Sequence, residues 1–107
     1  MISTHILDTS TGSPAAGVSV TLEQKSGTEW KALFSEKTNS DGRIRFECPR
    51  ETGAYRLTFG IESYIKDRGL KPFFLDVPIA FDITDTQRNY HIPLLLSPYG
   101  LSTYRGS

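Results

Sequence analysis

The sequence has few of the features that mark secreted, membrane-bound or nucleic-acid-binding proteins. Its single cysteine, Cys48, excludes an internal disulfide and suits a reducing compartment. No apolar run approaches the roughly 18 residues of a membrane span, and residues 1–5 do not begin a secretory signal. Lys and Arg number 12, and so do Asp and Glu, so charge gives no reason to expect a nucleic acid or a membrane as partner. We therefore expect a cytoplasmic location.

The common motifs of catalysis and metal binding are also missing. The sequence has no glycine-rich phosphate loop and no Gly-x-Ser-x-Gly motif. Its two histidines, His5 and His91, stand far apart in the chain, and zinc usually needs about three or four ligands. We therefore expect no metal and no cofactor. Cys48 has no basic neighbour on its own face, which indicates a small buried apolar residue and not a nucleophile.

The length of 107 residues is typical of one domain, and we predict a single domain over residues 1–107. A chain this short buries one modest core and has little left for a deep pocket. Any sizeable binding site is therefore expected between subunits.

Short alternating runs of apolar residues, separated by turn signals, predict an all-β protein. Residues rich in Gly, Pro, Asn, Asp and Ser form turn signals at 11–14, 26–27, 39–42, 48–49 and 97–100. Many short strands at this spacing favour an antiparallel sandwich or barrel. The runs of equal parity are Val18, Val20 and Leu22; Trp30, Ala32 and Phe34; Ile44, Phe46 and Cys48; Tyr55, Leu57 and Phe59; Val77, Ile79, Phe81 and Ile83; and Tyr90, Ile92, Leu94 and Leu96.

Residues 61–69 depart from the alternating pattern. They combine Ile61, Ile65 and several charged residues, and they close with Gly69. We predict one short helix there, with Gly69 near its C-terminal end.

The last alternating run predicts an unusual outer face. If its even-numbered residues face the core, then His91, Pro93 and Leu95 point outward. A solvated face normally carries charges, so this apolar character suggests a second burial surface and a partner subunit.

Arg43 is expected on an outer face as well. It follows the Asp41-Gly42 turn, where glycine tolerates positive φ and the aspartate is expected to cap its own backbone. Because Ile44 and Phe46 point inward, Arg43 points outward. Taken alone, Arg43 is more simply a solvated charge, His91 an incidental surface residue and His5 a structural histidine.

Two groups of motifs resemble known families. The segments 12–20, 38–43 and 55–57, with their Pro-Ala-x-Gly-Val, Asp-Gly and Tyr-x-Leu patterns, are similar to many prealbumin-like sandwich domains. The ending Tyr-Arg-Gly-Ser at 104–107 and the opening Ser-Thr-His-Ile-Leu-Asp at 3–8 resemble 5-hydroxyisourate hydrolase, a transthyretin-related family. The resemblance covers essentially the whole chain. Family members often have a tyrosine in place of Leu101 and a histidine or another polar residue near Asn89, and we assign chemistry to neither position.

The resemblance implies a fold, an assembly and a site. The fold is a transthyretin-like antiparallel β-sandwich of two four-stranded sheets with one short helix. The assembly is a homotetramer, a dimer of dimers, with active sites in a channel between subunits. The family's functional positions correspond to His5, Arg43, His91 and Ser107 as catalytic residues and to Tyr104, Arg105 and Gly106 as substrate-binding residues.

The implied reaction belongs to purine catabolism. Water opens the ring of 5-hydroxyisourate and yields 2-oxo-4-hydroxy-4-carboxy-5-ureidoimidazoline. Histidine suits the proton transfers because its reference pKa is about 6.5. We expect His91 to act as general base beside Arg43, which disfavours the imidazolium and donates to a substrate carbonyl. His5 would bind substrate or relay the proton, Ser107 would hold water or substrate, and the two histidines could exchange roles.

Two other functions remain open. The chain could be a transthyretin-type carrier that holds a flat aromatic ligand, such as a thyroid hormone, in the channel between subunits. It could also be an adhesion or scaffold module of the prealbumin-like kind. Family carriers lack the Tyr-Arg-Gly-Ser ending, and a scaffold module predicts a polar outer sheet, so both are less favoured than the enzyme.

Overall fold

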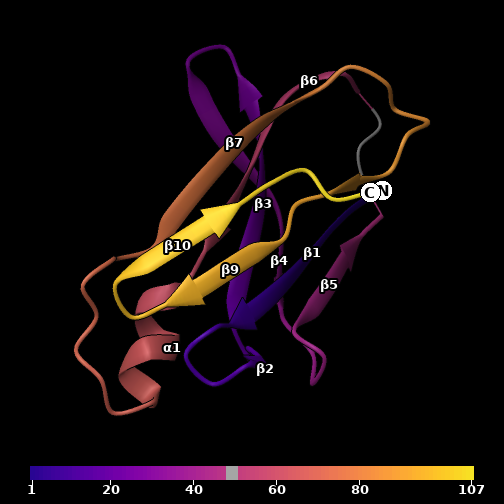
Figure 1. The fold of residues 1–107 in the computed structure, drawn as a ribbon. Coiled ribbons are helices and arrows are strands. Elements are labelled where there is room, and N and C mark those ends of the chain that lie inside the picture. Colours follow the sequence, from indigo (N-terminus) through magenta and orange to yellow (C-terminus); the bar gives the residue numbers. More distant parts are fainter. Residues whose placement is uncertain (48–50) are drawn as a thin grey trace.

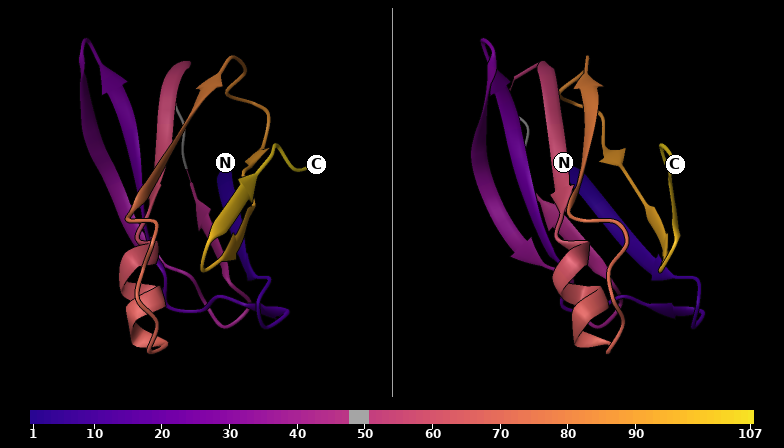
Figure 2. Two further views of the ribbon diagram at one scale, coloured as in Figure 1. Left: turned by 60° about the vertical axis from the view of Figure 1, so that its left-hand side comes forward. Right: turned by 90° about the vertical axis from the view of Figure 1, so that its left-hand side faces the viewer.

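The computed structural model describes residues 1–47 and 51–107, in which two β-sheets pack face to face with one short helix at the end of the sandwich (Figure 1, Figure 2). One sheet has four antiparallel strands in the order β4-β3-β6-β7. Their bounds are Ser19–Ser26 for β3, Glu29–Lys37 for β4, Gly53–Phe59 for β6 and Val77–Ile83 for β7.

The second sheet is built around β1 (Ile2–Asp8), which has two partners along each edge. β5 and β8 flank its first half, β2 and β9 flank its second half, and β10 continues the sheet beyond β9. Six segments thus fill a sheet that is four strands wide, in the order β10-β9-β1-β2. The bounds are Ser13–Pro14 for β2, Arg43–Phe46 for β5, Tyr90–His91 for β8, Leu94–Ser97 for β9 and Gly100–Thr103 for β10.

The predicted all-β sandwich with a short helix is confirmed, with one difference in strand direction. β8 and β9 run parallel to β1, so this sheet is mixed and not purely antiparallel. The chain comes to β8 from β7 in the opposite sheet, and a strand reached by such a crossover is free to run parallel to its neighbour.

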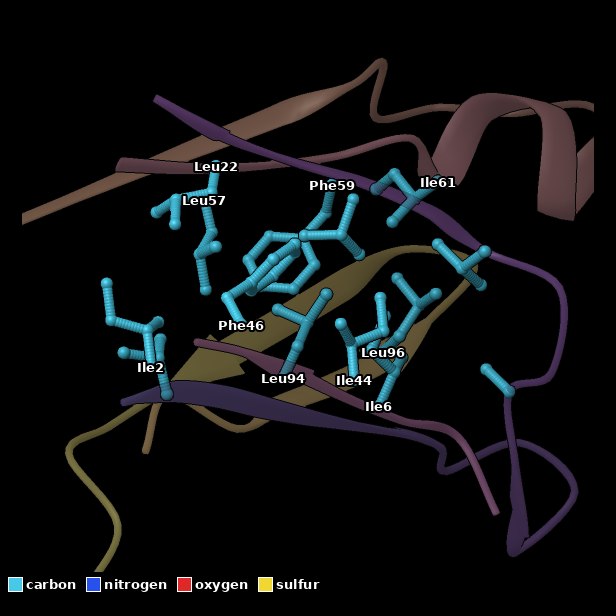
Figure 3. Packing of buried hydrophobic residues seen from close by; sticks show 14 of the residues in the cluster. Ile2, Ile6, Leu22, Ile44, Phe46, Leu57, Phe59, Ile61, Leu94 and Leu96 are labelled. Carbon is cyan, nitrogen blue, oxygen red and sulfur yellow. The ribbon is translucent and has the colours of Figure 1, made fainter. Parts of the chain in front are cut away.

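The core fills the space between the two inner faces (Figure 3). Leu22, Leu57 and Phe59 project from one sheet toward Ile6 and Leu94 of the other. All of these side chains are buried. Nine further residues of the predicted alternating runs are buried as well: Val18, Val20, Ile44, Phe46, Tyr55, Ile83, Tyr90, Ile92 and Leu96. Cys48 and the predicted 48–49 turn lie outside the described residues.

β4 contradicts the common face predicted for Trp30, Ala32 and Phe34. Phe34 pairs with Leu22, but Ala32 pairs with Glu23, so the ladder contains a bulge at the intervening residue of β4. Residues opposite each other in an antiparallel pair share a face, so Ala32 and Trp30 lie on the outer side with Glu23. Phe34 lies on the inner side but remains 51% exposed at the sheet edge.

The predicted helix is confirmed as α1 (Ile61–Asp67). It buries Ile61 and Ile65 against the core and exposes its other face. Gly69 follows with a φ of 78° and donates its N–H to the carbonyl of Lys66 over 2.9 Å, a common way to end a helix. Within the described residues, no helix is long and apolar enough to cross a membrane.

A buried carboxylate at the end of β1 fastens α1 to this sheet. Asp8, 2% exposed, accepts hydrogen bonds from Tyr64 over 2.9 Å and from Arg68 over 2.7 Å. Burial raises the pKa of Asp8. Hydrogen bonds from Ser10 and Tyr64 and the charge of Arg68 together outweigh that effect, so the pKa is lowered overall. This stabilisation is present above the unfolded value of about 4 and is lost as the pH falls through the lowered pKa.

The turn before β5 sets the direction of Arg43. The side chain of Asn39 accepts the backbone N–H of Asp41 over 2.9 Å and that of Arg43 over 3.0 Å. The cap predicted for Asp41 therefore belongs to Asn39, because an Asx side chain accepts from the amide two residues ahead. Gly42 has a φ of 73°, and its carbonyl accepts the N–H of Ile6 over 2.8 Å.

We expect Gly42→Ala to destabilise the protein more than a matched glycine substitution. A Cβ at Gly42 would lie 2.6 Å from the carbonyl oxygen of Ile6, whereas a Cβ at Gly12, whose φ is 71°, would meet nothing within 4 Å. Gly12→Ala should lower the free energy of unfolding by about 1 kcal/mol, and Gly42→Ala by about 3 kcal/mol. Urea denaturation of both variants measures the difference, and equal losses would contradict the steric argument.

Candidate active site on the outer face of β1

A solvent-open hollow of about 570 Å³ lies on the outer face of the β1 sheet. It collects side chains from the start of β1, the turn before β5, β5 itself, β8 and the chain end. Met1 and Ser107, at the two ends of the chain, also line it. Its polar lining includes Ser3, Asn39, Arg43, Arg45, Asn89, His91 and Ser107.

The pairing of β1 with β5 brings His5 next to Arg43. The two residues are direct partners in the antiparallel register, so their side chains share the outer face. Thr4 and Ile6, the neighbours of His5, are buried. Since side chains alternate along a strand, His5 points outward. The predicted outward orientation of Arg43 is confirmed, since Ile44 is buried and Arg43 is exposed.

The pairing of β1 with β8 brings His91 to the same face. Ser3 is its register partner, and the Ser3 hydroxyl lies 2.8 Å from Nδ1 of the imidazole. On the other side, Gly106 donates its N–H to the His91 carbonyl over 2.7 Å. A Cβ on Gly106 would lie 2.6 Å from Cδ2 of the ring, so only glycine allows the backbone to lie this close.

The surroundings of His91 disfavour its charged form. Burial lowers the pKa of His91 below its ordinary value, and the charge of Arg43 and the nearby His5 lower it further, against a smaller upward effect of Ser3. A neutral imidazole retains a lone pair and accepts protons near neutral pH. The expectation that Arg43 disfavours the imidazolium agrees with this lowered pKa.

The tail is divided between two places. Ser107 lines the hollow and Gly106 contacts His91. Tyr104 and Arg105 instead line a second hollow of about 300 Å³, together with Phe81 of β7. Within one protomer, the structure therefore gathers His5, Arg43, His91, Gly106 and Ser107 and leaves Tyr104 and Arg105 apart.

The tail also changes the predicted outer face around β9. His91 and Leu95 are half-buried, as outward parity allows, but Pro93 is buried. Gly106 approaches Pro93 closely, and the Thr103 hydroxyl donates to the Pro93 carbonyl over 2.7 Å. The chain's own tail thus covers part of the surface that we assigned to a partner.

Four polar residues of the hollow, Ser3, Asn39, Arg45 and Asn89, were not predicted as site residues. Ser3 lies two residues before His5 on the same face of β1, a spacing that could have identified it. Asn39 was visible as a turn residue but not as lining. Asn89, to which we assigned no chemistry, lies at the entrance to β8 and also lines the hollow.

This arrangement can support hydrolysis. A neutral imidazole beside a guanidinium supplies a proton acceptor for water and a donor for a developing oxyanion. The planar guanidinium of Arg43 is also suited to the carbonyl groups of a flat polar substrate.

Comparison with known proteins gives one consistent family. The HIUase/Transthyretin family model matches residues 2–106. A 5-hydroxyisourate hydrolase of Salmonella dublin is 46% identical over 110 residues, which cover 100% of this chain and 81% of that protein. A solved structure of Klebsiella pneumoniae 5-hydroxyisourate hydrolase has a TM-score of 0.87 at 40% identity, covering 99% of this chain and 98% of that one. Sea bream transthyretin in complex with thyroxine has a TM-score of 0.92 at 28% identity, covering 98% and 93%.

We expect Arg43→Gln to raise the pKa of His91. The substitution removes a positive charge that disfavours the imidazolium, so the ring should take up its proton at higher pH. The measurement is an NMR titration of the His91 ring. Lys31→Gln, which removes an exposed charge on β4, is the matched control and should leave the titration unchanged. An unaltered His91 titration in Arg43→Gln would contradict the electrostatic coupling.

Proposed function

This chain belongs to the HIUase/Transthyretin family, and we propose that its outer-face hollow hydrolyses 5-hydroxyisourate to 2-oxo-4-hydroxy-4-carboxy-5-ureidoimidazoline. The proposal places the protein in urate breakdown. Relatives that carry the name 5-hydroxyisourate hydrolase are 39–46% identical over essentially the whole chain. The observation that carries it is His91, whose pKa is lowered, held beside Arg43 and His5 on one face of the β1 sheet.

We propose His91 as the general base. Its imidazole takes a proton from water while the water oxygen bonds to a ring carbonyl carbon of the substrate. Arg43 donates to the carbonyl oxygen as negative charge develops there. The C–N bond of the ring then breaks, and the departing nitrogen receives the proton from the imidazolium. Atoms and charge balance without a cofactor.

The remaining predicted residues take supporting roles. His5 lies next to Arg43, and there it would bind substrate or relay the proton. Ser107 lines the hollow, where it would hold water or substrate. In this proposal, Gly106 allows the tail to lie against the His91 ring. The substrate-binding role of Tyr104 and Arg105 stays a prediction, because their side chains line the second hollow.

We also propose that the working form is a homotetramer, a dimer of dimers. The hollow is open to solvent on one protomer. Excluding bulk water, other than the reacting molecule, from a catalytic site requires a cover. Leu95 adds half-buried apolar surface to the same outer face. A second protomer packed there would close the hollow into a channel. The cytoplasmic location likewise stays a prediction.

The alternative is a carrier of a flat aromatic ligand. The TM-score of 0.92 with a thyroxine-bound transthyretin shows that the same scaffold serves such a protein. Identity to that carrier is 28%, however, against 46% to a hydrolase. A basic and polar hollow also suits proton transfer from water better than it suits an apolar aromatic ligand.

The protein should accelerate the decay of 5-hydroxyisourate, and His91→Asn should lower this activity by about 100-fold or more. Asparagine keeps a polar side chain of similar size but cannot take up the proton. Urate oxidase generates the substrate in the cuvette, and its ultraviolet absorbance is followed with and without the protein.

The uncatalysed decay is measured alongside, because the substrate breaks down unaided. Lys31→Gln, which alters an exposed residue of β4 outside the hollow, should retain full activity. A folded protein that does not accelerate the decay would favour the carrier, and full activity in His91→Asn would remove His91 from the mechanism.

A chain that ends at Thr103 should stay folded and lose most of its activity. Thr103 keeps its hydrogen bond to Pro93, so β10 should remain in place. The His91 carbonyl loses the N–H of Gly106, and the hollow loses Ser107. Circular dichroism reports the fold, and the absorbance assay reports activity. Retained activity would exclude residues 104–107 from the site.

A further inference from the structure

The imidazole of His91 has one side-chain hydrogen-bonding partner within residues 1–47 and 51–107. Its Nδ1 lies 2.8 Å from the Ser3 hydroxyl, in a pair of residues aligned by the β1–β8 register. Gly106 covers the Cδ2 edge, where even a methyl group would meet the ring at 2.6 Å. The ring is thus held on two sides, and Nε2 is the nitrogen left for a water or substrate molecule.

We propose that Ser3 is a positioning residue that keeps the His91 proton on Nδ1 and leaves Nε2 unprotonated as the base. This inference rests on the proposed hydrolase function for its consequence in catalysis. The protonation pattern of the ring does not depend on that function, because it can be measured without substrate.

The direction of the hydrogen bond decides which nitrogen is reactive. A serine hydroxyl can donate or accept. If it donates to Nδ1, Nε2 carries the hydrogen and cannot take a proton from water. If it accepts from Nδ1–H, Nε2 keeps its lone pair. A second partner that orients the base is a recurrent requirement of such sites.

The main chain favours the accepting arrangement. The Ser3 backbone raises the pKa of His91, against the larger lowering by burial, Arg43 and His5. An upward effect is that of an acceptor facing a ring N–H, because it stabilises the protonated form. The Ser3 hydroxyl lies at Nδ1 and can accept that proton as well.

The charged and titratable groups around His91 are the same in every variant of Ser3. They come from each element around the ring and so set a constant background for a comparison. They are His5 on β1, Arg43 and Arg45 on β5, and Met1 and Ser107 at the two chain ends.

The decisive measurement is the nitrogen-15 chemical shift of the His91 ring at neutral pH, without substrate. We expect the wild-type protein to show a protonated Nδ1 and an unprotonated Nε2. In Ser3→Ala the signals should move toward the form protonated on Nε2, and Ser3→Thr, which keeps a hydroxyl, should restore the wild-type pattern. With only two histidines in the chain, His5→Gln assigns the signals.

The kinetic readout separates positioning from packing. Ser3→Ala should lower kcat by roughly 10- to 100-fold with little change in KM. It should also move the acidic limb of the pH profile to lower pH, because an acceptor that stabilises the imidazolium is lost. Ser35→Ala is the matched control, since it removes a hydroxyl from an exposed position on β4, and it should change neither the profile nor the ring.

Two results would overturn the inference. One is a wild-type ring protonated on Nε2, and the other is a Ser3→Ala ring identical to wild type. If instead the ring behaves as expected but the wild-type protein does not accelerate substrate decay, the positioning role stands and the proposed hydrolase function fails. The two ideas are thus tested separately.

Discussion

Strand β1 is hydrogen-bonded along both edges, and the core and the hollow both depend on that position. Its inward residues Ile2 and Ile6 enter the core, while its outward residues Ser3 and His5 reach the opposite face. Each outward residue meets a partner from a different strand, Ser3 with His91 and His5 with Arg43. A shift of β1 by one residue would reverse both faces together. The burial of the core therefore also enforces the alignment of the site.

The scaffold carries little information about chemistry. A thyroxine-bound transthyretin has a TM-score of 0.92 to this chain and a hydrolase has 0.87, so backbone similarity does not separate the two functions. The proposed chemistry rests instead on side chains of one outer face. Partial burial and a neighbouring cation lower the pKa of His91, and these effects suit that strand surface to the proposed proton transfer.

Period-two alternation predicted the fold well where strands form uninterrupted ladders. It identified the inward residues of β3, β6 and β9, and the same parity placed Arg43 and His91 on outer faces. It failed at β4, where one extra residue separates the partners of Leu22 and Glu23. Such a bulge depends on how two strands pair, which the alternation within either strand does not record. Pro93 shows a similar limit, because the tail that buries it comes from another part of the chain.

The sequence by itself determined which residues enter the core, where the helix lies and which family the chain resembles, because these follow from local periodicity, turn residues and continuous motifs. The tertiary structure decided which polar residues meet. Ser3 and His91 are far apart in the sequence and contact only because β8 runs parallel beside β1. The division of the tail between two hollows was settled in the same way. Contacts between distant segments depend on sheet order and register, and those are properties of the assembled fold.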